Sequence, residues 1–466
     1  MQPMSVSAIS DVVGGVLSDV ANPDAVVDQS TVFDSRSARP GSLFLALEGE
    51  HVDGHDYAAA AVSAGATVVL AQRPVGVPAI VVDDVLAAFG RLGQHLVRNA
   101  LHGTTIVAVT GSAGKTSTKD LIAQVLAAAG STVATPGSFN NEIGLPLTIS
   151  MAAPGTGFLV LEMGARGIGH IRDLTVIAPP QISVVTNVGT AHVGEFGGRD
   201  KIAQAKGEIV EALEPGGLAV LNADDPLVMA MAPRTRARIV TYGRGEAAAI
   251  RASDVVINEH GQAHYTLTTP EGAADVQLQV VGEPQIHNSL AAAAVAREAG
   301  LSTARIAELL SGATAQSRWR METHTRADGV TVINDAYNAN PDSMKSSLEA
   351  LAVMARGQRQ RGIAVLGQMN ELGQDSRTAH EGVGRIAAQL NLDQIIVIGG
   401  DEAQWMQQAA EAAGAVVVHL PDQDTALHLL RSTVRSGDVV LVKASRGVQL
   451  QQLAEKLLQL DPEVAV

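Results

Sequence analysis

One short segment has residues whose types and order suit the binding of a nucleoside triphosphate. A β-branched apolar run, Thr104–Thr110, leads through a glycine-bearing turn into an Ala/Leu-rich helical pattern, and the turn reads Thr110-Gly111-Ser112-Ala113-Gly114-Lys115-Thr116-Ser117. Glycines let backbone N–H groups point at phosphate oxygens, and the N-terminus of the following helix adds a favourable dipole. In such a loop the lysine reaches the β- and γ-phosphates and the threonine hydroxyl ligates Mg²⁺. We therefore predict that this turn binds the phosphates of a nucleotide.

The turn departs from the standard phosphate-loop pattern G-x-x-x-x-G-K-[ST], because Val109 stands where the first glycine belongs. What remains is the shorter G-x-x-G-K-T, and an ordinary glycine turn with a surface lysine is the plainer alternative. The strand before the turn and the helix after it favour nucleotide binding. Kinases, GTPases, motor proteins and ligases all contain phosphate loops, so the loop alone does not identify the class of enzyme.

Two further residues could complete a phosphoryl-transfer site. Glu162 directly follows the apolar run Phe158–Leu161, and His192 follows a second apolar run by a short turn. The carboxyl ends of parallel strands meet at one edge of a sheet, so both side chains are expected near the phosphate loop. Each also has a plainer interpretation: Glu162 could be a solvent-exposed acid, and His192 could be a structural histidine. Lys206, within a helical pattern, is by composition alone a solvated lysine.

The elements that must position these residues fall into three blocks. Residues 1–100 alternate short apolar runs with helical patterns, as in a small α/β unit. Residues 101–313 contain strongly apolar strand candidates, followed by an alternating apolar and polar segment, Ile250–Val281, that favours antiparallel strands. Residues 314–466 repeat strand and helix, which predicts an open, mostly parallel sheet of the Rossmann-like kind. We place the linkers at Leu101–Gly103 and Gly312–Ser317.

The individual runs set the expected boundaries. The helical patterns cover Asp84–Arg98, Lys201–Leu213, Asn288–Glu298 and Thr303–Leu310. Local alanine runs such as Ala291–Ala294 are interpreted as tightly packed helix. The expected strands are Ser42–Leu47, Thr67–Leu70, Ala79–Val82, Thr104–Thr110, Phe158–Leu161, Ile182–Thr186, Leu218–Leu221, Val330–Asn334, Ile363–Leu366, Gln394–Ile398, Ala415–Leu420 and Val439–Val442.

Composition limits the function classes. The chain has 466 residues, 33 basic and 48 acidic side chains for a net charge of −15, and 46% hydrophobic residues, so about three ordered domains are expected. Aromatic residues at 3% and the acidic balance argue against a nucleic-acid partner. Without cysteine there is no disulfide and no catalytic thiol. The first residues lack a basic signal region and no apolar run is long enough to span a membrane, so we expect a cytoplasmic protein.

Several of these motifs together resemble one family. Thr110–Thr116, Glu162, the turn from Asn187 to His192, and Ala205-Lys206-Gly207-Glu208 are similar to the central domain of the Mur ligases, ATP-dependent amide-forming enzymes of peptidoglycan precursor synthesis. Asp335–Ser343 and Leu366–Gly373 resemble the member that adds D-alanyl-D-alanine to UDP-N-acetylmuramoyl-tripeptide, although Gln368 stands where an acid is more usual. The resemblance covers essentially the whole chain and implies a monomer.

The resemblance also implies how the substrates are bound. Asp34-Ser35-Arg36 with the Asp53–His55 segment matches the family's uridine-nucleotide domain, and a hydroxyl with an arginine fork suits a diphosphate. Ser138–Pro146 resembles the family loop that contacts the muramoyl-peptide. The plainer interpretation of this segment is a helix cap and a turn that precede a strand. The substrate contacts implied in this way are Ser35, Arg36, Asp53, His55, Asn140, Asn141, Tyr337, Asn338, Asn340, Ser343, Lys443, Ser445 and Arg446.

For ATP the resemblance implies three contacts beyond the loop. Asn288 would read the adenine edge, Asp335 the ribose hydroxyls, and Arg320 the γ-phosphate, with Arg318 close enough to leave that last assignment open. Lys206 matches a lysine that CO₂ carboxylates in the family, which turns a cation into an anion able to assist Mg²⁺. The expected catalytic residues are Lys115, Lys206, His192 and Arg320, and the expected metal contacts are Thr116, Glu162, His192 and carboxylated Lys206.

The predicted reaction is amide formation from a carboxylate through an acyl phosphate, with the C-terminal domain closing over ATP. Two alternatives stay open at this point. One is a sister ligase that adds a single amino acid to UDP-muramoyl-dipeptide, or glutamate to folate, and it differs at Asp335–Ser343. The other is a kinase or nucleotide switch, which the three-block layout disfavours.

Overall fold

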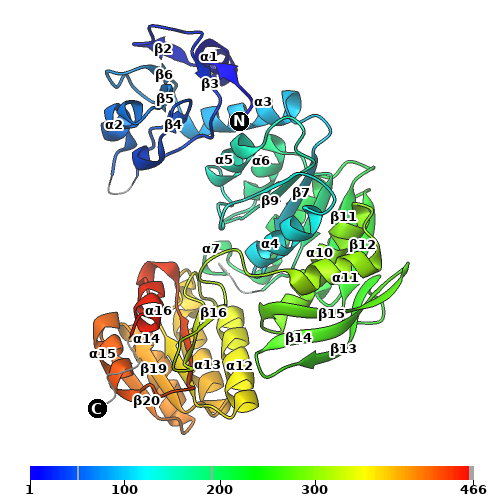
Figure 1. The fold of residues 1–466 in the computed structure, drawn as a ribbon, viewed down its shortest axis with the longest axis vertical. Helices are drawn as coiled ribbons and strands as arrows, with labels where there is room; N and C mark the ends of the chain where they lie inside the picture. Colours follow the sequence, from blue (N-terminus) through cyan, green and yellow to red (C-terminus); the bar gives the residue numbers. More distant parts are fainter. Residues whose placement is uncertain (50–51, 190–192, 461–466) are drawn as a thin grey trace.

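The computed structural model describes the chain except residues 50–51, 190–192 and 461–466. Figure 1 shows three α/β regions that follow one another along the chain, each built around its own sheet. This architecture confirms the predicted α/β class with mostly parallel sheets. Among the described residues no helix combines the length and the apolar character that crossing a membrane requires.

The N-terminal region has a small sheet whose strands present alternate residues to two cores. Phe44 and Val69 face helix α2 (Ala58–Ser63), whereas Leu43 and Leu70 face helix α1 (Val6–Val13) and helix α3 (Val85–Asn99). Alternation of this kind follows from the two-residue period of a strand. The sheet order is β2 (Val16–Ser18), β6 (Ala79–Val81), β5 (Val68–Ala71), β4 (Leu43–Leu45), and β1 (Met4–Ser5) pairs separately with β3 (Val26–Val27).

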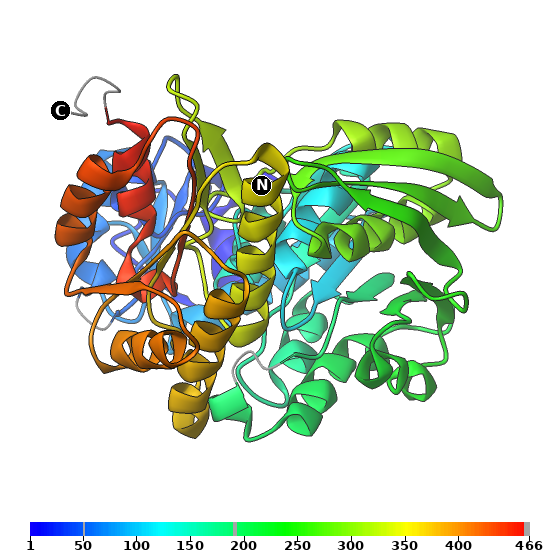
Figure 2. The ribbon, with the colours of Figure 1, turned by 90° about the horizontal axis from the view of Figure 1, so that it is seen from below.

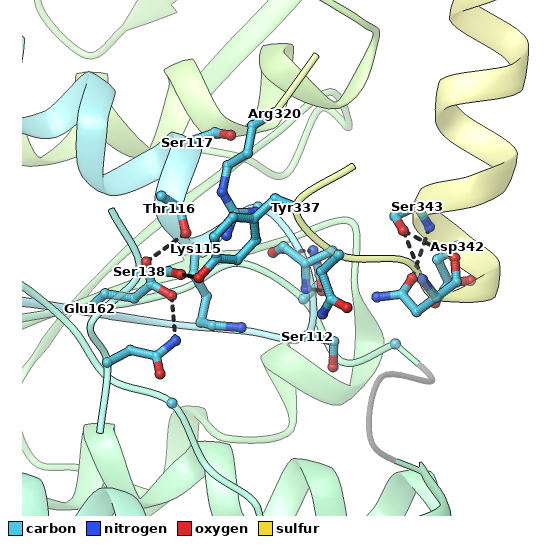
Figure 3. Close-up of a pocket in the computed structure, with 18 of the residues that line it drawn as sticks. Ser112, Lys115, Thr116, Ser117, Ser138, Glu162, Arg320, Tyr337, Asp342 and Ser343 are labelled. Atoms are coloured by element: carbon cyan, nitrogen blue, oxygen red, sulfur yellow. Dashed lines mark hydrogen bonds between the residues drawn. The ribbon is translucent and has the colours of Figure 1, made fainter. Parts of the chain in front are cut away.

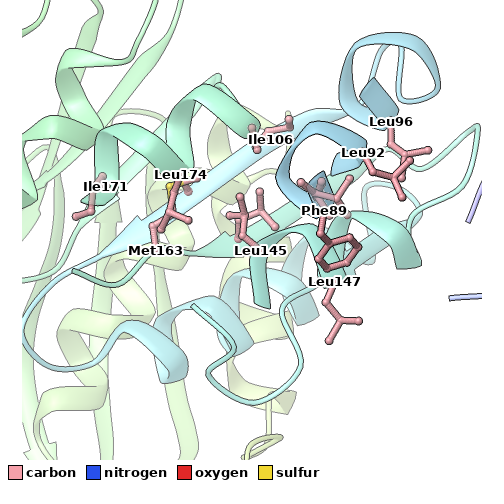
Figure 4. Packing of buried hydrophobic residues seen from close by; sticks show 14 of the residues in the cluster. Phe89, Leu92, Leu96, Ile106, Leu145, Leu147, Met163, Ile171 and Leu174 are labelled. Carbon is pink, nitrogen blue, oxygen red and sulfur yellow. The ribbon is translucent and has the colours of Figure 1, made fainter. Parts of the chain in front are cut away.

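Helix α3 joins the N-terminal region to the central region. Its side chains Phe89 and Leu92 are fully buried and belong to the same apolar cluster as Leu145 and Leu147 of α5 (Gly144–Met151), as Figure 4 shows. At Gly93 a Cβ atom would lie 3.1 Å from Pro146 Cβ, so the two helices approach closely there. The first two regions therefore share one core.

The central sheet is parallel through most of its width and antiparallel at one edge. The strand that leads into the phosphate loop, β7 (Thr105–Thr110), is buried on both faces, because Ile106 and Val107 contribute to different apolar clusters. The alternating segment forms antiparallel strands, as predicted. The order is β15 (Gly272–Val281), β14 (Gln262–Thr269), β13 (Ile250–Ile257), β12 (Arg238–Gly243), β11 (Leu218–Asn222), β10 (Ile182–Val185), β7, β9 (Phe158–Glu162), β8 (Thr132–Ala134).

Helices cover both faces of this sheet. On one face α4 (Lys115–Leu126) packs against α10 (Pro284–Glu298), whose buried residues Ala291–Ala294 confirm the tightly packed helix predicted from the alanine run. The other helices of the region are α6 (His170–Ile177), α7 (Val193–Phe196), α8 (Arg199–Glu211), α9 (Pro226–Met229) and α11 (Thr303–Gly312).

The C-terminal region is an open sheet with helices on both faces. Its strands are parallel except the edge strand β16, in the order β16 (Glu322–Thr325), β17 (Thr331–Asn334), β21 (Val439–Lys443), β18 (Gly362–Leu366), β19 (Gln394–Ile398), β20 (Val417–Leu420). One face carries α12 (Pro341–Gln358), α13 (Ser376–Gln389) and α14 (Asp401–Ala412), and the other carries α15 (Gln423–Thr433) and α16 (Gln451–Leu458).

The C-terminal region contacts the central region at α12 and at the loop after β18. In Figure 2 helix α12 (yellow) lies at the boundary between the two regions. The Gln358 side chain donates a hydrogen bond of 3.0 Å to the Glu259 carbonyl in the turn between β13 and β14. Gly194 of α7 lies so close to Gly373 that a Cβ on Gly194 would be 2.7 Å from the Gly373 nitrogen.

Candidate active site

A cavity of about 1180 Å³ lies between the central and C-terminal regions, at the carboxyl ends of β7 and β9. Its walls combine the phosphate loop, the loop from Ser138 to Glu142, the start of α10, and the segment from Tyr337 to Ser347. Parallel sheets place ligands at this edge, so its position agrees with the expectation from sequence.

The conformation of the phosphate loop requires glycine at two positions and is stabilised by hydrogen bonds to Asn187. Gly111 (φ 156°) and Gly114 (φ 78°) have positive φ angles, and a Cβ at Gly114 would lie 2.6 Å from Asn288 Oδ1. Asn187, just after β10, accepts hydrogen bonds from the backbone nitrogens of Ser112 (3.0 Å, to its carbonyl) and Ala113 (2.9 Å, to its side chain). Lys115 begins α4, and its Nζ donates to the Gly111 carbonyl at 2.8 Å. The strand, turn and helix required of a phosphate loop are thus present.

The end of β9 brings a carboxylate to the loop. Thr116 Oγ1 donates to Glu162 Oε2 at 2.7 Å, and Asn140 Nδ2 donates to Glu162 Oε1 at 2.7 Å (Figure 3). Glu162 is only 1% exposed, so it is not the solvated strand-end acid of the plainer interpretation. The Asn140 amide orients this carboxylate, and the neighbouring Asn141 accepts from the Gly144 nitrogen at 3.0 Å at the start of α5.

Lys206 projects from α8 into the cavity and is 4% exposed. Burial, reinforced by the positive charge of Lys115, holds the pKa of Lys206 well below its ordinary value. Among the described residues its amine has no hydrogen-bond or ion-pair partner. A solvated helix lysine is therefore the wrong interpretation. A neutral amine is the nucleophilic form, which is the form that can add CO₂. His192, the other predicted metal contact, lies outside the described residues.

The oxygen atoms at this point suit a hard divalent cation. No group of three or more His, Asp or Glu side chains that could hold a metal occurs in the part of the chain that the structure describes. Thr116 and Glu162 nevertheless place a hydroxyl and a carboxylate oxygen 2.7 Å apart, and Mg²⁺ binds through few protein oxygens together with water and phosphate. Lys206 as a cation would repel the ion, whereas its carbamate would add two oxygens, so the donor set fits Mg²⁺ best when Lys206 is carboxylated.

Arg320 is presented to the cavity by strained backbone. The residues on either side, Trp319 (φ 62°) and Met321 (φ 51°), adopt left-handed conformations that non-glycine residues seldom take. The Met321 nitrogen donates to Asp335 Oδ1 at 3.0 Å, which helps to stabilise this backbone. Arg320 lines the cavity, whereas Arg318 forms an ion pair of 2.7 Å with Glu455. Of the two arginines between which the sequence left the choice open, Arg320 is therefore the one whose side chain reaches the cavity.

Burial, followed by the charge of Arg320, lowers the pKa of Lys115, whereas the charge of Glu162 raises it. Lys115, Arg320 and Lys206 thus bring three basic side chains to one cavity. A polyanionic ligand would relieve the repulsion among these groups.

Asp335, at the end of β17, is tied to several groups of the C-terminal region. Lys443 Nζ and Ser347 Oγ each donate to Asp335 Oδ2 at 2.6 Å. Lys443 is 2% exposed and also donates to the Asn338 carbonyl at 3.0 Å, so its amine is engaged within the protein. Ser347 was not predicted as a site residue, because no sequence motif distinguishes it from the other serines of α12.

Other predicted contacts also have structural partners. Asn340 and Ser343 form a capping box at the start of α12, each side chain accepting from the other's backbone nitrogen. Asn288, near the start of α10, accepts from Thr118 Oγ1 at 3.0 Å and donates to Gln285 Oε1 at 2.9 Å. Ser445 accepts from the Asn370 nitrogen at 2.9 Å, and Asn338 from the next backbone nitrogen. All except Ser445 line the cavity.

The N-terminal candidates lie outside this cavity. Arg36 is exposed and pairs with Asp34 at 2.7 Å, and hydrogen bonds from Arg36 lower the pKa of Asp34 to about 2. Asp53 accepts from His55 Nδ1 and from Arg73, both at 2.6 Å. Ser35 begins the short helical turn that contains Arg36. The structure therefore groups these residues on the N-terminal region, apart from the phosphate loop.

The Ser138–Asn141 loop links the two groups. The Phe139 ring packs edge-on against Phe33 of the N-terminal region, with ring centroids 6.1 Å apart. The preceding residue, Ser138, forms a hydrogen bond with Tyr337 of the C-terminal region (Figure 3). One loop thus contacts all three regions of the chain.

A three-part α/β chain with a phosphate loop, a strand-end carboxylate and a buried lysine is the architecture of an ATP-dependent amide ligase. Three family models match it: the Mur ligase family catalytic domain at residues 31–96, the Mur ligase middle domain at 109–296, and the Mur ligase glutamate ligase domain at 319–446. The chain belongs to the Mur ligase family.

Within the family, the chain is similar to proteins whose names describe one particular ligase. The UDP-N-acetylmuramoyl-tripeptide–D-alanyl-D-alanine ligase of Mycobacterium tuberculosis is 46% identical, with 98% of each chain covered. The crystal structure of MurF from Acinetobacter baumannii is 30% identical with a TM-score of 0.86, covering 98% of this chain and 99% of its own. The MurF ligase of Thermotoga maritima in complex with ADP is 30% identical with a TM-score of 0.78, covering 93% of this chain and 97% of its own.

Proposed function

We infer that this chain is an ATP-dependent ligase that joins UDP-N-acetylmuramoyl-tripeptide to D-alanyl-D-alanine through an amide bond. The observation that carries this conclusion is the 46% identity, over 98% of both chains, to a ligase named for these substrates. The cavity supplies the chemistry the reaction needs, since it combines a phosphate loop with Glu162, Lys206 and Arg320.

The reaction has to convert a carboxylate oxygen into a leaving group. A carboxylate oxygen of the tripeptide attacks the γ-phosphorus of ATP, ADP departs, and an acyl phosphate forms. The amine of D-alanyl-D-alanine then attacks the acyl carbon, loses a proton, and expels inorganic phosphate. The products are UDP-N-acetylmuramoyl-pentapeptide, ADP and phosphate.

The cavity residues act mainly by positioning and by stabilising charge. Phosphoryl transfer requires little covalent chemistry from a protein, and fixed cations stabilise its transition state. We assign Lys115 and Arg320 to the β- and γ-phosphates, Asn288 to adenine and Asp335 to the ribose. We assign Thr116, Glu162 and carboxylated Lys206 to Mg²⁺, with His192 as a further ligand; when bound, the ion neutralises phosphate charge.

Each of the three regions is assigned a different substrate. We propose that residues 1–100 bind the uridine nucleotide, residues 101–313 bind ATP, and residues 314–466 bind the dipeptide and close over the nucleotide. ATP and a uridine-diphosphate sugar are cytoplasmic metabolites, so we place the enzyme in the cytoplasm. We further expect it to act as a monomer, as the resemblance to the family implies.

The test is product analysis with the three substrates. Purified protein should release phosphate only when ATP, the UDP-muramoyl-tripeptide and D-alanyl-D-alanine are all present, and mass spectrometry should detect the pentapeptide. Release that responds to a single amino acid in place of the dipeptide would indicate a sister ligase. Phosphorylation or ATP hydrolysis without a new amide would indicate a kinase or a nucleotide switch.

A further inference from the structure

The guanidinium of Arg320 is positioned by an aromatic ring. Among the described residues Arg320 forms no ion pair, and its guanidinium lies over the ring of Tyr337, 4.2 Å from the centroid (Figure 3). A cation within about 6 Å of an aromatic face is attracted by the ring quadrupole. An aromatic ring restrains a guanidinium and leaves its charge available to an anion. The neighbouring Arg318, by contrast, is paired with Glu455.

Tyr337 itself is fixed at three points. Its backbone nitrogen donates to the Trp319 carbonyl at 3.1 Å, so the ring belongs to the same unit as the strained segment around Arg320. Arg446 Cζ lies 5.3 Å from the ring centroid, and its Nη1 donates to the Tyr337 hydroxyl at 3.4 Å. The hydroxyl also forms a hydrogen bond with Ser138 Oγ.

The bond to Ser138 crosses from the C-terminal to the central region. Ser138 is two residues from Asn140, whose side chain donates to Glu162. A short chain of contacts therefore connects the arginine on one side of the cavity to the carboxylate on the other. This connection exists only while the C-terminal region lies against the Ser138–Asn141 loop.

We propose that Tyr337 is a positioning residue for phosphoryl transfer: its ring aligns Arg320 without neutralising it, and its hydroxyl connects that alignment to Ser138. This proposal rests on the proposed function, and it gives Tyr337 a role other than the direct substrate contact expected from the sequence. Because Tyr337 acts through Arg320, its loss should affect turnover more than the binding of ATP.

The first experiment compares two substitutions of Tyr337. Tyr337→Leu removes ring and hydroxyl, and kcat for pentapeptide formation should fall about tenfold or more, as misplacement of a catalytic group does, with KM for ATP changed less than about threefold. Tyr337→Phe keeps the ring and should recover most of kcat. Tyr57→Leu, at an exposed tyrosine of the N-terminal region, is the matched control.

A double-substitution cycle separates positioning from a merely structural role. In an Arg320→Ala background, Tyr337→Leu should lower kcat no further, because the group it positions is already gone. Ser138→Ala combined with Tyr337→Phe should be no worse than Tyr337→Phe alone, since the loss of the tyrosine hydroxyl already removes the bond to Ser138. The proposal is overturned if Tyr337→Leu stays within about twofold of wild type, or if it lowers kcat equally with and without Arg320. Wild-type protein that forms no amide would instead contradict the proposed function.

Discussion

Thr116 donates a hydrogen bond of 2.7 Å to Glu162, from the first turn of α4 to the last residue of β9. These residues belong to different motifs of the sequence. The bond fixes the phosphate loop and the carboxylate relative to each other. It places two oxygen atoms of the kind that Mg²⁺ prefers at the same point of the cavity.

The first prediction concerns this pair. Glu162→Gln keeps the shape of the side chain and removes its negative charge, so the Mg²⁺ concentration for half-maximal activity should rise at least about tenfold, and kcat should fall. Titration of ligase activity with MgCl₂ measures both effects. Glu142→Gln, at an exposed carboxylate lining the same cavity, should leave the titration unchanged. An unaltered Mg²⁺ requirement in Glu162→Gln would remove Glu162 from the metal site.

The second prediction concerns CO₂. If Lys206 is carboxylated, activity should decline in buffer freed of CO₂ and return when bicarbonate is added. Protein incubated with ¹³C-bicarbonate should show a carbamate signal by NMR that is absent in Lys206→Met. Lys201→Met, at an exposed lysine of the same helix, should keep both the signal and the activity. A wild-type enzyme indifferent to CO₂ would contradict the modification.

The third prediction follows from the lowered pKa of Lys206 in CO₂-free buffer. Between this pKa and the ordinary value of 10.5, the unfolded chain binds a proton that the folded protein does not. The contribution of Lys206 to the free energy of unfolding therefore increases with pH across this interval and levels off above it. Lys206→Met lacks this pH-dependent contribution. The free energy of unfolding of the wild type should therefore rise relative to that of Lys206→Met as the pH approaches 10.5. Urea unfolding of both proteins over this range measures the difference, and a constant difference would contradict it.

The strands and helices that position the site were largely predictable from sequence. The apolar run before Glu162 and the run before the phosphate loop became β9 and β7, because strands buried on both faces need continuous apolar residues. The short edge strand β16 was not predicted, since Glu322–Thr325 is mostly polar and pairs along one side only. The segment after Asn141 forms helix α5, where a strand was the plainer alternative.

Site residues were predictable where a local sequence motif itself indicates the chemistry. They were less predictable where contacts between distant segments determine the position of a side chain. The loop at Lys115 is recognisable because glycine spacing and flanking elements suffice. Burial of Lys206 could not be read from the sequence, because an isolated lysine on a helix is normally solvated. Tyr337 was expected to contact substrate, but no local pattern could place Arg320 over its ring, which depends on two segments that meet through the fold.

The fourth prediction concerns the shared core of the first two regions. Phe89 of α3 is fully buried in the cluster that includes Leu145, so Phe89→Ala should lower the free energy of unfolding by about 3–5 kcal/mol. Because α3 packs on both regions, they should lose stability together. Urea unfolding followed by circular dichroism measures the loss, with Val16→Ala, at an exposed valine, as the control. Independent transitions for the two regions would contradict a shared core.

The fifth prediction concerns the contact between Gly194 and Gly373. A Cβ on Gly194 would lie 2.7 Å from the Gly373 nitrogen, and since that neighbour is backbone, one of the two segments must move. Gly194→Ala should therefore hold the C-terminal region away from α7 and lower kcat for amide formation about tenfold. ADP affinity should fall less than kcat, because the phosphate loop and Asn288 belong to the central region and only the ribose contact assigned to Asp335 would be lost.

Activity assays with calorimetric titration of ADP separate these two effects. Gly382→Ala is the matched control, since a Cβ at that helical position meets no atom within 4 Å. Small-angle scattering with all ligands present should show a larger radius of gyration for Gly194→Ala than for Gly382→Ala. Equal kcat values for the two variants would mean that this backbone contact is not needed for the catalytic arrangement, because the clash would then have been absorbed without moving the C-terminal region.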